Sequence, residues 1–356
     1  MALKDESNDE LEQTPTFSGS LERHFGSKLA RLYTNILLAG ASGDALGKWT
    51  EFISTTDKIE RRWPGGLRSF RQVEDHLNGV PPPYTDDTQM SLIVLRALIH
   101  ARKHGESINA LCTRIAGQFA TTWLQDPTTM DRAPGNACLA ASYSLRANLP
   151  ARPDPAWWKA GAPGAGGCGA VMRAYPFALV YADQPEFAVR AAAEHGMITH
   201  GAALSSAATA AFVAGVLAGI HGKDCPAMVT AMVQAAEAYD HETAAMIESA
   251  AAMGVDPIVA QGDVLGTRDS PSFPGQLRGW AGHEAIAAAA FLLARHGTDT
   301  EAAVIGGVNT PGDSDSIASI AGVLCAAAGG AIPAEWSSVE GAAGFRDLCD
   351  ELVKQG

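Results

Sequence analysis

Two short segments rich in carboxylate and hydroxyl side chains lie far apart in the chain, and each directly precedes an apolar segment. Residues 85–88 read Thr-Asp-Asp-Thr, and residues 313–316 read Asp-Ser-Asp-Ser. The apolar run over residues 317–328 ends at Gly329 and Gly330, which predicts a buried helix with a glycine after its C-terminus. Both segments therefore begin a helix, where unpaired backbone N–H groups favour carboxylates and hydroxyls. One Asp or Ser is enough for an N-cap, so two carboxylates in each segment exceed what capping requires.

Brought together, the carboxylates of the two segments would place about four negative charges in one pocket. These carboxylates belong to Asp86, Asp87, Asp313 and Asp315. They could not all stay ionised unless cations compensated them. Oxygen ligands without clustered His or Cys favour Mg²⁺, Mn²⁺ or Ca²⁺ over zinc. An EF-hand loop is excluded, because its sixth position would be Ala318 and its twelfth would be Leu324.

Thr85 and Ser316 add neutral oxygens to the same set. Six protein oxygens leave room for water and substrate around two ions, and two ions can hold a pair of substrate oxygens. The residue types therefore predict a metal-assisted hydrolase. A structural metal site and plain helix capping remain open as alternatives.

Other polar or glycine-rich segments are ambiguous when taken alone. Asp44 lies in Gly-Asp-Ala-Leu-Gly at a predicted helix end, accessible between its glycines, and Glu51 follows seven residues later. A turn residue and a surface charge explain this pair equally well. The glycine-rich loop over residues 164–169 could present N–H groups to a diphosphate or could be a flexible turn. It follows no convincing strand, and Cys168 within it has no local His partner that would make it a nucleophile.

Helical periodicity dominates the elements that must position these residues. It begins near Leu29, and alternating Val/Ile-rich runs are nearly absent, so a sheet is hard to build. We find no repeat of solenoid period and no linker after residue 25. The sequence predicts one all-α domain over residues 26–356, preceded by an acidic, disordered arm over residues 1–25. Ala- and Leu-rich helices are expected in the second half at about residues 188–196, 202–220, 225–238, 242–253, 283–296 and 316–328.

Composition narrows the function classes. The 356 residues are 47% hydrophobic with a net charge of −13, which argues against binding to a nucleic-acid backbone. The six cysteines form no Cys-x-x-Cys pair and, with a start too polar for a signal peptide, predict a cytoplasmic protein. The uncharged run 201–220 has membrane-spanning length, but its Ala, Gly, Ser and Thr content indicates a core helix, and no membrane partner is expected. Residues 81–84 match a Pro-Pro-x-Tyr ligand, although we interpret them as a stiff lead-in to Thr85.

Several short motifs occur in the order found in one enzyme family. The motifs are G-D-A-L-G, T-D-D-T, R-A-P-G-N, G-C-G-A-V-M-R, T-H-G, G-W-x-G-x-E and G-D-S-D-S. Over about residues 33–336 the chain resembles the ADP-ribosylglycohydrolases, which include the dinitrogenase-reductase-activating glycohydrolase and bacterial ADP-ribosylarginine hydrolases. The resemblance implies an orthogonal bundle of helices around a centre of two Mg²⁺ or Mn²⁺ ions.

The resemblance also implies roles for individual residues. The expected metal ligands are Thr85, Asp86, Asp87, Asp313, Asp315 and Ser316. Ser316 stands where many members have Thr, and either hydroxyl should serve. Asp87 and Asp315 are expected to be catalytic together with Glu51, the family's candidate for orienting water or the scissile group. Asp44 should line the same pocket, and the expected contacts to the diphosphate and distal ribose come from Gly135, Gly167, Cys168, Gly169 and His200.

The implied activity is the removal of ADP-ribose from modified proteins, with arginine as the expected acceptor. One alternative is an immunity-type protein that binds and occludes a cognate ADP-ribosyltransferase toxin through its N-terminal arm, with or without hydrolysis. Another is a non-catalytic relative similar to the family's lens crystallins, which the complete acidic set disfavours because a crystallin role needs no metal ligands.

Overall fold

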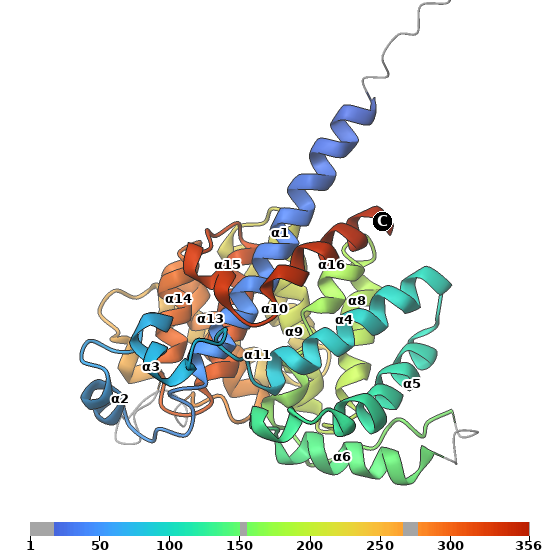
Figure 1. Ribbon diagram of the computed structural model, residues 1–356, viewed down its shortest axis with the longest axis horizontal. Helices are drawn as coiled ribbons and strands as arrows, with labels where there is room; N and C mark the ends of the chain where they lie inside the picture. The colour runs from blue at the N-terminus through green and yellow to red at the C-terminus, as the bar shows by residue number, and fades with distance from the viewer. Residues whose placement is uncertain (1–17, 150–154, 266–276, 356) are drawn as a thin grey trace, which may run out of the picture.

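The computed structural model describes residues 18–149, 155–265 and 277–355. Within these ranges the chain is helical and contains no strand, apart from isolated bridges that join Ala162 to His200 and Gly167 to Ala281. The prediction of an all-α fold is confirmed (Figure 1).

The helices follow one another as α1 (Ser18–Gly47), α2 (Thr56–Arg62), α3 (Glu74–Leu77), α4 (Asp86–His104), α5 (Ile108–Gln118), α6 (Asn136–Ala147), α7 (Pro176–Val180), α8 (Pro185–Gly196), α9 (Ala203–Ile220), α10 (Cys225–Glu237), α11 (His241–Val255), α12 (Gln261–Val264), α13 (Gly282–His296), α14 (Thr300–Val308), α15 (Ser314–Ala327) and α16 (Ala342–Gln355). Short 3₁₀ turns lie at Phe70–Val73, Thr129–Arg132, Cys168–Ala170 and Ala334–Ser338, and a π turn lies at Phe119–Trp123.

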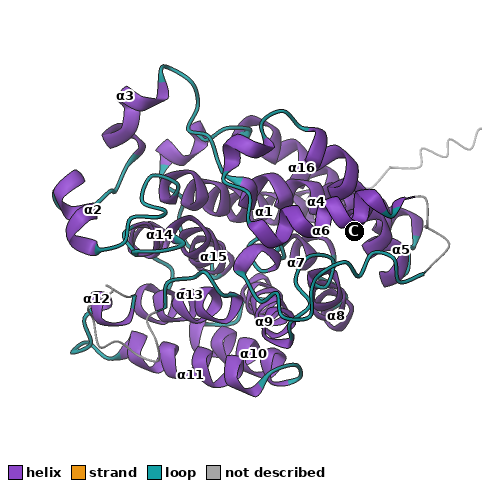
Figure 2. Cartoon of the chain, turned by 90° about the horizontal axis from the view of Figure 1, so that it is seen from below, coloured by secondary structure: helices purple, strands orange, loops and turns teal. Residues whose placement is uncertain are grey.

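Helix α15 forms the centre of the molecule. Every residue of Ser314–Ala327 is buried, and the helix packs against α1, α9, α13 and α14 (Figure 2). Its contact with α1 requires glycine, because a Cβ on Gly43 would lie 2.6 Å from the carbonyl of Ala318. The close approach brings the C-terminal end of α1 beside the first turn of α15, which is where the acidic residues of the second segment lie.

Helix α1 begins at Ser18, earlier than the start predicted near Leu29. Residues 18–25, which the sequence assigned to the disordered arm, are therefore helical. Residues 1–17 of that arm lie outside the described residues. The helix extends past the main body of the protein at its N-terminal end (Figure 1).

Within the described ranges, one helix is long and apolar enough to cross a membrane by length and composition, Ala203–Ile220. In the structure 67% of this segment is buried. It packs against α8, α10, α13 and α15, as the prediction of a core helix requires.

Candidate metal and substrate site

The first acidic segment forms the N-terminus of α4. Thr85 is the N-cap residue, and its Oγ1 accepts a hydrogen bond from the backbone N–H of Asp87 at 3.3 Å. The chain before it is pinned, because Arg132 donates a hydrogen bond to the carbonyl of Tyr84 at 2.6 Å. Residues 81–84, the predicted stiff segment before Thr85, thus end at a fixed point from which α4 begins.

Asp44 holds this corner from α1. Its Oδ1 accepts a hydrogen bond from the N–H of Thr85 at 2.8 Å, and its Oδ2 accepts two from Thr88, at 2.9 Å from N and 2.5 Å from Oγ1. Asp44 was expected to be accessible and to line the substrate pocket, but it is fully buried and does not line the cavity. Both of its oxygens accept hydrogen bonds from Thr85 or Thr88, so Asp44 positions the first segment.

The second segment forms the N-terminus of α15. Asp313 is the N-cap residue, and its N–H donates to the carbonyl of Arg278 at 2.8 Å. The hydroxyl of Ser314 donates to the carbonyl of Gly47 at 3.0 Å, which ties α15 to the end of α1. Because the chain turns at Gly47 toward Glu51, this bond also fixes the loop that carries Glu51.

The two acidic corners meet at one cavity of about 640 Å³. Most of the predicted site residues line it: Glu51, Asp86, Asp87, Gly135, Gly167, Cys168, Gly169, His200, Asp313, Asp315 and Ser316. Thr85 is fully buried behind them. One carboxylate oxygen from each of Glu51, Asp313 and Asp315 lies within 4.8 Å of the others.

Burial and mutual repulsion make these carboxylates hard to ionise together. Burial, followed by the charges of Asp315 and its neighbours, raises the pKa of Glu51 to about 10. The same two causes hold the pKa values of Asp86, Asp87 and Asp313 well above their ordinary range. Such a cluster is stable in its charged form only beside positive charge.

The donor set fits hard divalent cations. Asp87 Oδ2 and Asp315 Oδ1 are buried and have no hydrogen-bond partner among the described residues. A buried carboxylate oxygen without a partner is costly unless a cation satisfies it. All the donors are oxygens, which suits Mg²⁺ or Mn²⁺ better than a soft metal.

The opposite wall is built on the glycine-rich loop. A Cβ on Gly169 would lie 2.6 Å from Cys138 Sγ and 2.9 Å from His200 Cε1. Only glycine at this position therefore allows the loop to pack against these two residues. The N–H of Cys168 donates to the carbonyl of Trp280 at 3.1 Å, and is therefore not free for a diphosphate as expected. Burial raises the pKa of the Cys168 thiol well above its ordinary value, consistent with the prediction that it is no nucleophile.

The amide expected from Gly135 is also engaged, because it donates to Asp86 Oδ2 at 3.3 Å. Gly135 is the N-cap residue of α6, which has no side-chain cap. The next residues, Asn136 and Ala137, line the cavity. The N-terminus of α6 thus adds a positive dipole end that was not predicted from the sequence.

His200 is held by a buried arginine, the last residue of the motif G-C-G-A-V-M-R, which was not predicted as a site residue. Its Nδ1 lies 2.7 Å from Thr199 Oγ1, which accepts a hydrogen bond from Arg173 at 2.8 Å. Arg173 is fully buried and also donates to the carbonyl of Gly169 at 2.6 Å and to Nε2 of His195 at 3.0 Å. Burial and the charge of Arg173 lower the pKa of His200 to about 3, so the imidazole is neutral. In the sequence, the signal was a lone arginine within the apolar run 170–181.

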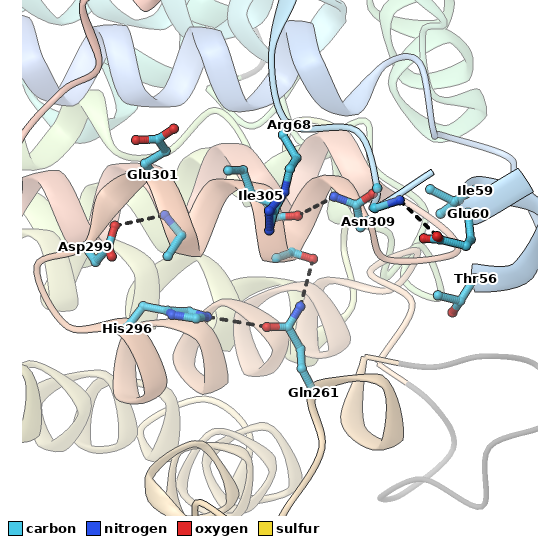
Figure 3. Close-up of a pocket in the computed structure, with 14 residues that line it drawn as sticks. Thr56, Ile59, Glu60, Arg68, Gln261, His296, Asp299, Glu301, Ile305 and Asn309 are labelled. Carbon is cyan, nitrogen blue, oxygen red and sulfur yellow. Dashed lines mark hydrogen bonds between the residues drawn. The ribbon is translucent and has the colours of Figure 1, made fainter. Parts of the chain in front are cut away.

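A separate cavity of about 510 Å³ lies between α2, α12 and α14 (Figure 3). None of the predicted site residues lines it. Its polar groups serve the local structure: Asp299 Oδ1 accepts from the N–H of Ala302 at 3.0 Å, and Glu60 Oε1 accepts from the N–H of Gly65 at 2.9 Å. We therefore place the chemistry in the acidic cavity.

Fold and site together define an all-α protein with an acidic, hard-cation site inside a substrate-sized cavity. The chain matches the model of the ADP-ribosylglycohydrolase family over residues 27–356, and it belongs to that family. Its general class is therefore that of glycosyl hydrolases acting on ADP-ribose, a family that is typically metal-dependent.

Two individual proteins illustrate the relationship. An uncharacterized protein of Archaeoglobus fulgidus is 26% identical over 312 residues, which cover 85% of this chain and 90% of the relative. A solved structure described as an ADP-ribosylglycohydrolase-related protein complex has a TM-score of 0.67 at 21% identity, covering 92% of this chain and 99% of that chain. The structural likeness confirms the fold of the ADP-ribosylglycohydrolases.

Proposed function

We propose that this protein is a cytoplasmic hydrolase that removes ADP-ribose from arginine side chains of modified proteins. The supporting observation is the buried carboxylate cluster with unpartnered oxygens on Asp87 and Asp315, facing a cavity large enough for a nucleotide sugar. The arginine acceptor fits an acidic cavity, because carboxylates such as Glu51, ionised once cations offset the neighbouring charges, favour a guanidinium over a neutral serine oxygen.

We propose that two Mg²⁺ or Mn²⁺ ions bind at Thr85, Asp86, Asp87, Asp313, Asp315 and Ser316. When bound, these ions supply positive charge that orients and polarises the hydroxyls of the ribose. Glu51 stands beside Asp313 and Asp315 and is poised to move a proton at the bond between ribose and acceptor. That bond breaks through an oxocarbenium-like state, which the surrounding carboxylates favour.

The other wall binds and orients the substrate. The N-terminus of α6 and the neutral imidazole of His200 can offer hydrogen bonds to the diphosphate and distal ribose. Arg173 lies beneath this wall and adds positive charge without entering the cavity. Anionic substrate groups are thus drawn away from the carboxylates.

The test is the release of ADP-ribose from arginine-, serine- and nucleic-acid-linked substrates with and without Mg²⁺. We expect Mg²⁺-dependent release from the arginine-linked substrate, and its loss in Asp87→Asn but not in Asp131→Asn, a control at an exposed carboxylate. Full activity in EDTA would contradict the metal-dependent mechanism. Comparable or faster release from the serine-linked substrate would overturn the arginine assignment.

We propose a protein partner as a second function, namely a cognate ADP-ribosyltransferase toxin bound through the N-terminal region. The extension of α1 past the body of the protein supports it, because a projecting helix can reach a partner without obstructing the cavity (Figure 1). Hydrolysis and occlusion are compatible, since they use different parts of the molecule.

A further inference from the structure

Two large aromatic side chains stand exposed together at the mouth of the acidic cavity. Phe52 is 67% exposed and Trp280 is 42% exposed, and both line the cavity. Their ring centroids are 5.4 Å apart with an interplanar angle of 24°, which is a stacked pair. A single exposed aromatic residue needs no explanation, but a stacked pair at the opening of a binding cavity indicates a ligand contact.

The backbone holds both residues firmly in this exposed position. Phe52 has a φ of 64°, a left-handed conformation that is strained for a bulky residue. Its N–H donates to the carbonyl of Gly312 at 3.3 Å, which keeps the strained loop in place. The carbonyl of Trp280 accepts from the N–H of Cys168, and a Cβ on the preceding Gly279 would lie 2.8 Å from Ile317 Cγ1. The pair is therefore part of a rigid site.

Both rings are linked to the carboxylate cluster through the backbone. Phe52 directly follows Glu51, and Trp280 is two residues from Arg278, whose carbonyl binds the N–H of Asp313. The bond that a glycohydrolase breaks must lie beside the carboxylates, so the acceptor attached to that bond lies near these rings. Carboxylates and aromatic faces together form a favourable environment for a planar cation.

We propose that Phe52 and Trp280 form an acceptor-binding element that stacks on the guanidinium of the ADP-ribosylated arginine. The inference rests on the proposed function and adds the residues that select the acceptor. The two rings already contact each other, so the guanidinium packs on their outer face and not between them. A neutral acceptor such as serine gains nothing from this surface, so the pair sets the preference for arginine.

The test separates acceptor binding from ADP-ribose binding. Phe52→Leu and Trp280→Leu remove a ring and keep an apolar side chain, Trp280→Phe retains a ring, and Tyr143→Leu is a control at an exposed ring outside the cavity. In Mg²⁺ we expect each ring-to-leucine change to raise KM for ADP-ribosylarginine roughly tenfold, a fold-change that matches a cation–π contact. Trp280→Phe and Tyr143→Leu should stay within about threefold, and the calorimetric Kd of ADP-ribose should change less than about twofold.

The outcomes distinguish this inference from the proposed function. Equal weakening of ADP-ribose and ADP-ribosylarginine would show that the rings hold ADP-ribose itself, and an unchanged KM would show that they bind nothing; either result overturns the inference alone. A wild-type protein that hydrolyses serine-linked but not arginine-linked ADP-ribose would also overturn it. A wild-type protein that binds no ADP-ribose would contradict the proposed function, and the acceptor site with it.

Discussion

Aspartates of the same site have opposite surroundings in this protein. Asp44 is fully buried with three hydrogen bonds to its carboxylate, whereas Asp87 Oδ2 and Asp315 Oδ1 are buried without a partner among the described residues. A carboxylate with both oxygens hydrogen-bonded is satisfied by the chain itself. An unsaturated one needs a cation, so the hydrogen-bond partners decide which aspartates are expected to bind metal.

Removing one unsatisfied carboxylate should stabilise the metal-free protein. Asp315 is the largest neighbouring charge that raises the pKa of Asp86, Asp87 and Asp313, so Asp315→Asn relieves repulsion. We expect Tm in EDTA to rise by roughly 2 °C or more and the further rise on adding Mg²⁺ to disappear. Thermal unfolding in EDTA and in Mg²⁺ measures both effects. A lower Tm in EDTA with an intact Mg²⁺ response would contradict the assignment of Asp315 as a ligand.

Asp44→Asn should have the opposite effect. The amide nitrogen would face the N–H and hydroxyl of Thr88, and the loss of charged hydrogen bonds costs roughly 2 kcal/mol in the free energy of unfolding. Because the start of α4 carries proposed metal ligands, Mg²⁺ affinity should also fall about tenfold or more. Calorimetric Mg²⁺ titration measures this, with Thr88→Val as a control that removes one of the three bonds. Unchanged Tm and affinity would show that Asp44 does not position α4.

At the scale of the elements, the helices with regular apolar spacing were predicted well. The helix expected at 283–296 is Gly282–His296, and the one expected at 225–238 is Cys225–Glu237. Their Ala-rich stripes and the Pro or Gly residues at their ends are local signals. Helices α14 and α16 were not selected, although Phe345, Cys349 and Leu352 lie at helical spacing in α16 and are buried. The crossing of α1 and α15 depends on a contact between Gly43 and Ala318, residues far apart in the chain, and no local pattern reports it.

The residues of the site also fall into those that the sequence could predict and those that it could not. The meeting of Asp86, Asp315 and the other acidic side chains at one cavity could be predicted, because their types and spacing are visible in the sequence and match a family. The roles of Arg173, Phe52 and Trp280 depend on whether folding buries or exposes each side chain. The occupied amide of Cys168 depends on a hydrogen bond to a residue more than one hundred positions away. Such facts follow from tertiary packing alone.

The hydrogen bond between Arg173, which follows the glycine-rich loop, and His195 of α8 predicts that the free energy of unfolding depends on pH. His195 accepts a hydrogen bond from Arg173, and burial with that charge lowers its pKa well below the ordinary value. Below about pH 6.5 the unfolded chain therefore binds a proton at this histidine that the folded protein does not bind. The free energy of unfolding falls as the pH falls below this value. The loss approaches about 1.4 kcal/mol per pH unit for one such histidine.

His195→Gln tests this, because glutamine can still accept from Arg173 but does not titrate. Denaturant unfolding in Mg²⁺ between pH 7 and pH 5 should give a shallower slope for the variant, by up to about one proton. The contributions of the carboxylates are common to both proteins and cancel in the comparison. Identical slopes would show that His195 protonates freely in the folded state.

At the scale of the whole molecule, the protein is a helical body with a net charge of −13. Its N-terminal region is the part that is most easily removed by truncation. Gly26 of α1 lies near Val353 of α16, where an added Cβ would be 3.4 Å from Cγ1. A chain cut near Lys28 would therefore remove a turn of α1 that packs on the body. A boundary at Ser18 leaves this contact intact and removes only the preceding residues.

We expect the chain beginning at Ser18 to keep its hydrolase activity and to bind a cognate ADP-ribosyltransferase toxin at least tenfold more weakly than the full chain. The removed residues carry Leu11 and Phe17 among acidic side chains, and apolar anchors of this kind must offset the entropy of ordering a segment on a partner. Full-length protein with Leu11→Ser and Phe17→Ser keeps the charge, so it separates anchoring from electrostatic attraction. Calorimetry on the three proteins gives the answer. If all three bind the toxin equally, the segment before α1 has no part in recognition. If none binds it, the immunity function fails.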